Sequence, residues 1–85
     1  MANITLYTKD YCVYCANAKR LLTARGIEYN EVDITSDPSL EQELVTKTQQ
    51  RTVPQIFVES TFIGGFQELA RLIAQGKLDH LKRAA

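Results

Sequence analysis

The stretch Tyr7–Leu22, YTKDYCVYCANAKRLL, contains both cysteines of the chain, separated by two residues. Just before them, Asn3–Thr8 alternates apolar side chains with threonine and tyrosine, a pattern and composition that predict a strand. From about Cys12 to Arg25 the sequence is rich in helix formers, and Gly26 stands where a helix C-cap is expected. The cysteine pair is therefore expected where a strand passes into a helix.

The rest of the chain alternates between strand and helix patterns in the same way. A second strand after the first helix implies a parallel pair joined by a right-handed crossover. Aspartate followed by proline suits the N-cap and first position of a helix, and a two-residue connection between apolar runs suits a hairpin. The expected elements are a strand Ile27–Ile34, a helix from Asp37-Pro38 to about Thr48, strands Gln55–Val58 and Thr61–Ile63 joined by Glu59-Ser60, a helix Phe66–Gln75 before Gly76, and a short helix over 77–85.

This order predicts an α/β fold, β-α-β-α-β-β-α plus a short C-terminal helix, in which helices flank one mixed sheet of four strands. We expect residues 1–85 to form a single domain, because no linker, repeat or low-complexity segment interrupts the sequence.

The composition argues against several classes of partner. Apolar residues make up 45% of the chain, and ten basic residues balance ten acidic ones. This balance gives no reason to expect binding to nucleic acid or to a membrane surface. The N-terminus lacks a cationic start followed by an apolar run, and no stretch of eighteen residues is wholly apolar. We therefore expect a soluble, cytoplasmic protein.

The position of the cysteines suggests redox chemistry. Unpaired N–H groups and the positive end of the helix dipole favour an anion at a helix start, so we expect much of Cys12 to be thiolate near neutral pH. Cys15 lies one turn further along the same side of the helix and is expected to be less exposed. Its thiol is therefore placed to attack a mixed disulfide on Cys12.

Two structural roles for the cysteines are less well supported. A Cys12–Cys15 bridge would close too short a loop to restrain the unfolded chain much. Structural zinc usually needs four Cys or His ligands, and beyond the two cysteines the chain offers only His80 of these types. A zinc module would have to borrow ligands from another chain.

Three segments together resemble one family. YTKDYCVYCANAK, QQRTVPQIFV and FIGGFQEL are similar to the bacterial dithiol glutaredoxins, thioredoxin-fold oxidoreductases that use glutathione. The combination of Cys-x-x-Cys, Thr-Val-Pro some forty residues later and Gly-Gly about ten residues further is highly specific, and the similarity covers nearly the whole chain. The resemblance implies that Cys12 is the nucleophile and Cys15 the resolving cysteine.

The resemblance also implies a glutathione site. In the family, one tyrosine flanks the bound tripeptide, a lysine and a glutamine meet its glycine carboxylate, and the residue before a cis-proline pairs its backbone with the cysteinyl part. Paired glycines before a helix let the backbone approach a ligand and leave N–H groups for the γ-glutamyl carboxylate. The matching positions here are Lys9, Tyr14, Gln50, Thr52, Val53, Pro54, Gly65, Gln67 and Glu68.

The chain departs from the family pattern at two positions. Gln67-Glu68 stands where relatives usually carry two acidic residues, so one charge facing the ligand's ammonium group is lost. Val13 stands where dithiol members commonly carry proline, and it keeps an N–H near Cys12 that proline would lack. We expect the first change to affect glutathione affinity and the second to alter the reduction potential.

The resulting hypothesis is a glutathione-dependent thiol-disulfide oxidoreductase that reduces protein disulfides and protein–glutathione mixed disulfides. Glutathione is the expected reductant, the protein is expected to act as a monomer, and no tightly bound cofactor or metal is expected. One alternative is a redoxin recharged by thioredoxin reductase, with ribonucleotide reductase as its partner. Another is a carrier of a glutathione-ligated [2Fe-2S] cluster, the one case in which Cys12 would be a metal ligand.

Overall fold

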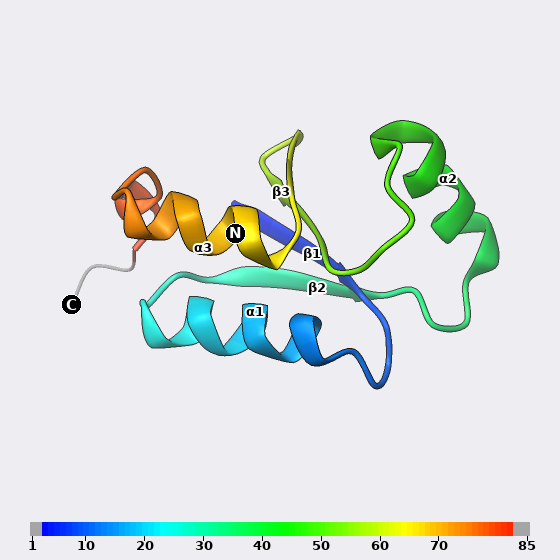
Figure 1. The fold of residues 1–85 in the computed structure, drawn as a ribbon, viewed down its shortest axis with the longest axis horizontal. Coiled ribbons are helices and arrows are strands. Elements are labelled where there is room, and N and C mark those ends of the chain that lie inside the picture. The colour runs from blue at the N-terminus through cyan, green and yellow to red at the C-terminus, as the bar shows by residue number, and fades with distance from the viewer. Residues whose placement is uncertain (1–2, 83–85) are drawn as a thin grey trace.

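The computed structural model describes residues 3–82 of the chain (Figure 1). The elements are β1 Ile4–Thr8, α1 Val13–Ala24, β2 Tyr29–Asp33, α2 Pro38–Thr48, β3 Gln55–Val58, β4 Thr61–Gly64, α3 Phe66–Ala74 and the 3-10 helix η1 Asp79–Leu81. Strands and helices alternate as far as α2, and a β3–β4 hairpin, a third helix and a 3-10 turn follow.

The four strands form one mixed sheet in the order β2-β1-β3-β4. β1 and β2 are parallel, whereas β3 pairs with β1 and with β4 in antiparallel fashion. α1 makes the crossover between the two parallel strands, so its N-terminus lies at the carboxyl end of β1. In open α/β sheets this edge is where binding and catalytic sites are found.

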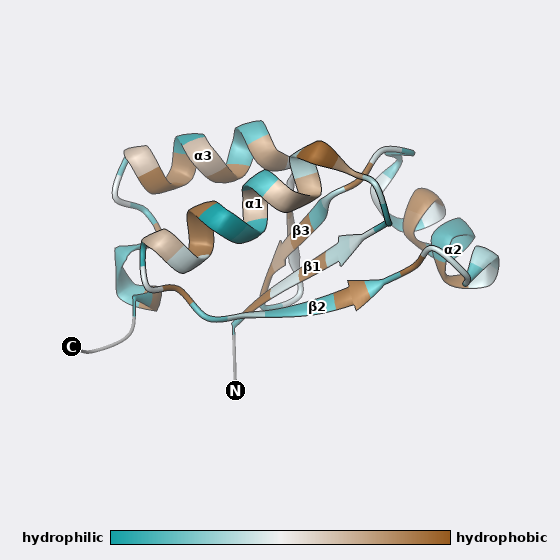
Figure 2. Cartoon of the chain, turned by 90° about the horizontal axis from the view of Figure 1, so that it is seen from below, coloured by the Kyte–Doolittle hydropathy of each residue, from teal (hydrophilic) through white to brown (hydrophobic). Residues whose placement is uncertain are grey.

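The alternation predicted for β1 separates the two faces of the sheet. Ile4 and Leu6 are fully buried in the larger core, together with residues of α1, β3 and α3. Tyr7 lies on the other face, in a smaller cluster around Leu44 of α2 and Phe57 of β3. Figure 2 shows α1 and α3 side by side over one face, while α2 lies apart from them near the end of the sheet.

Most of the predicted boundaries are confirmed. Cys12 is the N-cap of α1, and Asp37 caps α2 by accepting a hydrogen bond from Leu40 N–H at 3.1 Å. The Glu59-Ser60 connection joins β3 to β4. Gly26 has a positive φ of 70° two residues after the end of α1, as its expected place at a helix C-terminus requires.

Two predicted boundaries are wrong. β2 begins at Tyr29 and not at Ile27, because the buried Ile27 makes an isolated antiparallel bridge with Lys82 near the other end of the chain. The helix predicted over 77–85 is reduced to the single 3-10 turn Asp79–Leu81, and residues 83–85 lie outside the described part of the chain.

Candidate active site

Cys12 is placed by the turn that ends β1 and begins α1. Its backbone is extended, with φ −104° and ψ 109°, and its Sγ accepts a hydrogen bond from Cys15 N–H at 3.1 Å. The Cys12 thiol also lies 3.7 Å from the Val53 carbonyl oxygen, to which it donates. The sulfur therefore takes the capping position in which a helix N-terminus favours negative charge.

Cys15 is buried one turn further along α1, with 2% of its surface exposed. Burial, together with a hydrogen bond with the Cys12 side chain, raises the pKa of its thiol from 9.0 to about 12. Both cysteines are free thiols in this structure. Cys15 is thus less exposed than Cys12, as the sequence predicted, and its thiol ionises only at high pH.

This difference predicts selective alkylation by iodoacetamide. At pH 7 we expect label on Cys12 and almost none on Cys15, because a thiol with a pKa of about 12 holds roughly one part in 10⁵ as thiolate. Since the shift is upward, labelling of folded Cys15 should keep rising as the pH is raised from 9 towards 12. Peptide mapping by mass spectrometry measures both sites.

The chain unfolded in denaturant is the control. There the labelling rate of Cys15 should level off above the ordinary thiol pKa of 9.0. Equal labelling of folded and unfolded Cys15 at pH 7 would contradict the assigned burial.

A groove of about 300 Å³ runs beside Cys12, the half-buried cysteine, between the loop before β3 and the N-terminus of α3. The rings of Tyr14 and Phe66 lie on it with their centroids 6.0 Å apart and an interplanar angle of 31°. Every glutathione position implied by the resemblance except Lys9 lines this groove. Its lining residues are Tyr14, Gln50, Thr52, Val53, Pro54, Gly65, Phe66, Gln67 and Glu68.

The loop on one side of the groove is held by a buried glutamine. Gln55, 2% exposed, donates from Nε2 to the Gln50 carbonyl at 2.8 Å, and its Oε1 accepts from the Thr48 hydroxyl at 3.0 Å. The Val53-Pro54 peptide bond is cis, as the resemblance implied. Because the β3 ladder begins at Gln55, the backbone of Val53 lies just outside it, at the edge where an extended ligand can pair.

On the other side of the groove, a carboxylate from α3 itself caps the start of that helix. Glu68 Oε1 accepts a hydrogen bond from Gly65 N–H at 2.6 Å. The same carboxylate lies over Gly64, whose φ is 119° and where an added Cβ would come within 2.5 Å of Oε1. The N–H groups of the first turn of α3 have no partner within the helix and face the groove's end, a setting that suits an anion.

The structure separates Lys9 from the other implied residues. Its ammonium group forms an ion pair with Glu41 of α2, a long-range contact that the sequence did not suggest. Lys9 lines a second cavity of about 540 Å³, which both cysteines also line. The Lys9 ammonium group, which was predicted to lie close to Cys12, thus shares only this cavity with it.

Three further side chains near the cysteines were not predicted from the sequence. Lys19 and Glu31 also line the second cavity, and an ion pair joins them at 3.0 Å. The spacing of Lys19 four residues after Cys15 was a usable signal, since such residues share a helix face. Tyr11, fully exposed with φ 57°, had no signal in the sequence.

Within residues 3–82, His, Cys, Asp and Glu side chains do not gather in groups of three or more that would hold a metal ion. In the same range, each helix is too short or too polar to cross a bilayer.

Comparison with known proteins gives a consistent answer. The family model described as Glutaredoxin matches residues 4–63. The chain is 41% identical over 81 residues to Glutaredoxin 3 of Escherichia coli (strain K12), covering 95% of this chain and 98% of that protein. The solution structure of glutaredoxin from Brucella melitensis superposes with a TM-score of 0.82 at 42% identity, over 96% of this chain and 90% of that one. A crystal structure of a buckwheat glutaredoxin–glutathione complex superposes with a TM-score of 0.85 at 30% identity, over 93% and 74%.

Proposed function

Because the chain belongs to the glutaredoxin family and has its thioredoxin-like fold, we propose that it is a glutathione-dependent thiol-disulfide oxidoreductase. Its substrates are protein disulfides and protein–glutathione mixed disulfides, and residues 1–85 act as one domain. The observation that carries this proposal is the pairing of a capped, accessible Cys12 with a buried Cys15 beside the groove.

The dithiol route uses both cysteines. The Cys12 thiolate attacks a substrate disulfide, forms a mixed disulfide with one substrate sulfur and releases the other as a thiolate. Cys15 then loses its proton to solvent and attacks Cys12, which forms the Cys12–Cys15 disulfide and releases the second substrate sulfur. Two glutathione molecules reduce this disulfide and leave as oxidised glutathione.

The monothiol route uses only Cys12. Its thiolate takes glutathione from a glutathionylated protein, and the protein leaves with a reduced thiol. A second glutathione thiolate then attacks the glutathione sulfur of the Cys12 mixed disulfide, which releases oxidised glutathione and regenerates the Cys12 thiolate. This route needs the groove to hold glutathione with its sulfur next to Cys12.

The groove supports that arrangement through the groups on its walls. The first-turn N–H groups of α3 would hold the γ-glutamyl carboxylate, and the Val53 backbone would pair with the cysteinyl residue. Tyr14 would cover one face of the tripeptide, and Gln50 would meet its glycine carboxylate. The neighbours of these residues, Thr52, Pro54, Gly65, Gln67 and Glu68, complete the proposed site.

Glu68 has two roles in this proposal. Its carboxylate caps α3 through Gly65 N–H, and the same negative charge faces the place where the ligand's ammonium group would lie. Gln67 is exposed beside it and supplies a hydrogen-bonding amide without a charge. Lys9 would contribute a positive charge at longer range, partly neutralised by Glu41.

The choice of reductant tests the proposal. With NADPH, glutathione and glutathione reductase, the wild-type protein should turn over a glutathionylated peptide, because the groove would place glutathione against Cys12. NADPH consumption at 340 nm measures the rate, and a reaction without the protein is the control. Activity only when thioredoxin reductase replaces glutathione and its reductase would contradict the proposal and favour a redoxin of another kind.

The reducing compartment follows from the same chemistry. A protein recharged by glutathione works where glutathione is kept largely reduced, as it is in the cytoplasm. We therefore place the activity in the cytoplasm.

A further inference from the structure

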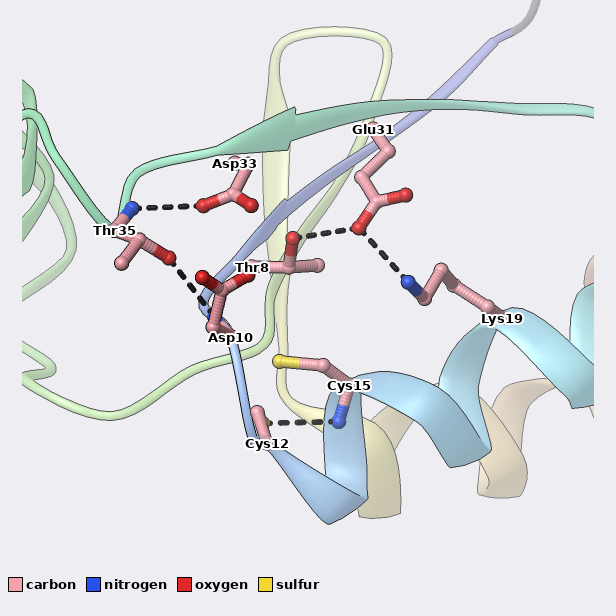
Figure 3. Close-up of polar contacts among 8 residues, drawn as sticks. All are labelled: Thr8, Asp10, Cys12, Cys15, Lys19, Glu31, Asp33 and Thr35. Carbon is pink, nitrogen blue, oxygen red and sulfur yellow. Dashed lines mark hydrogen bonds and ion pairs between the residues drawn. The ribbon is translucent and has the colours of Figure 1, made fainter.

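A small polar cluster joins β1, β2 and α1 on the side of the second cavity. The hydroxyl of Thr8, itself 1% exposed, donates to Glu31 Oε2 at 2.7 Å. Lys19 donates from Nζ to the same carboxylate oxygen at 3.0 Å. One carboxylate oxygen from β2 thus anchors both a buried hydroxyl from β1 and an ammonium group from α1 (Figure 3).

This cluster faces the buried cysteine. Lys19 is four residues after Cys15 and shares its side of α1. In Figure 3 the Cys15 side chain leaves the helix towards β1, and the Lys19 side chain leaves it towards Glu31 on the same side. Cys15, Lys19 and Glu31 line the same cavity of about 540 Å³. The positive charge of Lys19 lowers the pKa of Cys15, although burial and Cys12 outweigh it in the free dithiol.

The balance changes when Cys12 enters a mixed disulfide. Of the three influences that raise the pKa of Cys15, burial is the largest and the other two come from the Cys12 side chain. A Cys12 sulfur bonded to a substrate sulfur carries no negative charge and is a poorer hydrogen-bond partner. Burial still raises the pKa of Cys15, but the Lys9 backbone N–H and the charge of Lys19 both lower it.

We propose that Lys19, held by Glu31 and Thr8, accelerates the second step of the dithiol route by stabilising the thiolate of Cys15 as it attacks the mixed disulfide on Cys12. In this step the Cys15 proton passes to water, a Cys12–Cys15 bond forms, and the bond from Cys12 to the substrate sulfur breaks. The released thiolate takes a proton from water, so charge and atoms balance. This inference rests on the proposed function, and it makes the rate of Cys15 attack depend on a side chain other than the two cysteines.

The other charged groups around the cavity are paired or lie against solvent. Lys9 is engaged by Glu41, and Arg20 is exposed. Asp33 accepts from Thr35 N–H at 2.8 Å and is exposed, which screens its charge. The remaining titratable groups at the cavity or against Lys19 are Tyr29 of β2 and two exposed residues of the β1–α1 connection, Asp10 and Tyr11.

The charge of Lys19 persists over the relevant range of pH. Its hydrogen bond to Glu31 raises the pKa of the ammonium group, so Lys19 stays protonated near neutral pH. The hydrogen bond from Thr8 lowers the pKa of Glu31, so the carboxylate remains ionised near neutral pH. The ion pair is therefore intact at the pH of turnover.

The test resolves the two thiol steps by rapid acid quench. Reduced protein is mixed with oxidised glutathione, and mass spectrometry follows dithiol, glutathione adduct and intramolecular disulfide over time. In Lys19→Met the first step should stay within twofold of wild type and the second should slow about threefold. For each tenfold loss of Cys15 thiolate, the rate of the second step should fall only about threefold, because a thiolate of higher pKa is more nucleophilic.

Matched variants separate charge from structure. Lys19→Arg keeps the charge and should restore the second step to within twofold of wild type. Arg20→Met removes the neighbouring cation that lines the same cavity and should leave both steps unchanged. Lys19→Gln repeats the charge deletion with a polar side chain, and the pH profile of the second step should move to higher pH in both neutral variants.

A second step that keeps its rate and pH profile in Lys19→Met and Lys19→Gln would overturn the inference. Equal slowing in Lys19→Arg would also overturn it, since the charge would then be irrelevant. Absence of the first step in wild-type protein would instead overturn the proposed function. The two failures are therefore distinguishable in one time course.

Discussion

Replacing Cys12 with serine is expected to lower kcat/KM for a glutathione mixed disulfide by on the order of 10³-fold or more. A serine hydroxyl is far less acidic than a thiol and cannot form the mixed disulfide on which both routes depend. The measurement is the glutathione-coupled assay with a glutathionylated peptide. Residual activity within tenfold of wild type would contradict the role of Cys12.

The Cys12→Ser substitution should leave the fold and its stability nearly unchanged. Cys12 is the N-cap of α1 and accepts from Cys15 N–H at 3.1 Å, a role that a serine oxygen fulfils well. The thermal midpoint of Cys12→Ser should therefore stay close to that of wild type. A loss of activity in a folded variant can then be assigned to the missing sulfur.

Replacing Cys15 with serine should separate the two routes. Reduction of a protein disulfide should fall at least about 100-fold, because the intramolecular attack of Cys15 is replaced by attack of glutathione from solution. Deglutathionylation should stay within about threefold of wild type, since that route needs only Cys12. The two substrates are compared in parallel with the same enzyme preparations, and equal losses on both would contradict the assigned roles.

Burial of Cys15 calls for a second variant. The site is 2% exposed, so a serine hydroxyl there would cost about 1–2 kcal/mol of unfolding free energy if it finds no partner. Cys15→Ala removes the thiol without adding a polar group. If both variants lose disulfide reduction and keep deglutathionylation, the effect belongs to the sulfur and not to stability.

Local signals in the sequence were enough to predict the strand-to-helix junction and much of the fold. Three of these predictions depend on residues adjacent in the chain, and each is confirmed: Cys12 at a helix start, Asp37-Pro38 at the start of α2 and Glu59-Ser60 between β3 and β4. The relative exposure of the two cysteines followed from helix geometry in the same way. The cis bond before Pro54 came only from the resemblance, because no local signal distinguishes it from a trans bond.

Contacts between distant segments were the part that the sequence did not predict. Lys9 pairs with Glu41, and Glu31 with Lys19, across separations of 32 and 12 residues. Such pairs depend on the packing of α2 and on the β1–β2 register, neither of which periodicity fixes. The error at Ile27 has the same origin, since its partner is Lys82.

The fold of Glu68 back over Gly64 has a consequence for sequence variation. Gly64 has φ 119°, a conformation that side chains disfavour, and the space where its Cβ would lie is filled by the carboxylate of Glu68. Shortening residue 68 would relieve the crowding but not the backbone requirement at residue 64. Glycine at 64 is thus required both by its backbone conformation and by the Glu68 side chain that lies over it. Positions 64 and 68 therefore cannot vary independently, because the residues tolerated at one depend on the side chain at the other.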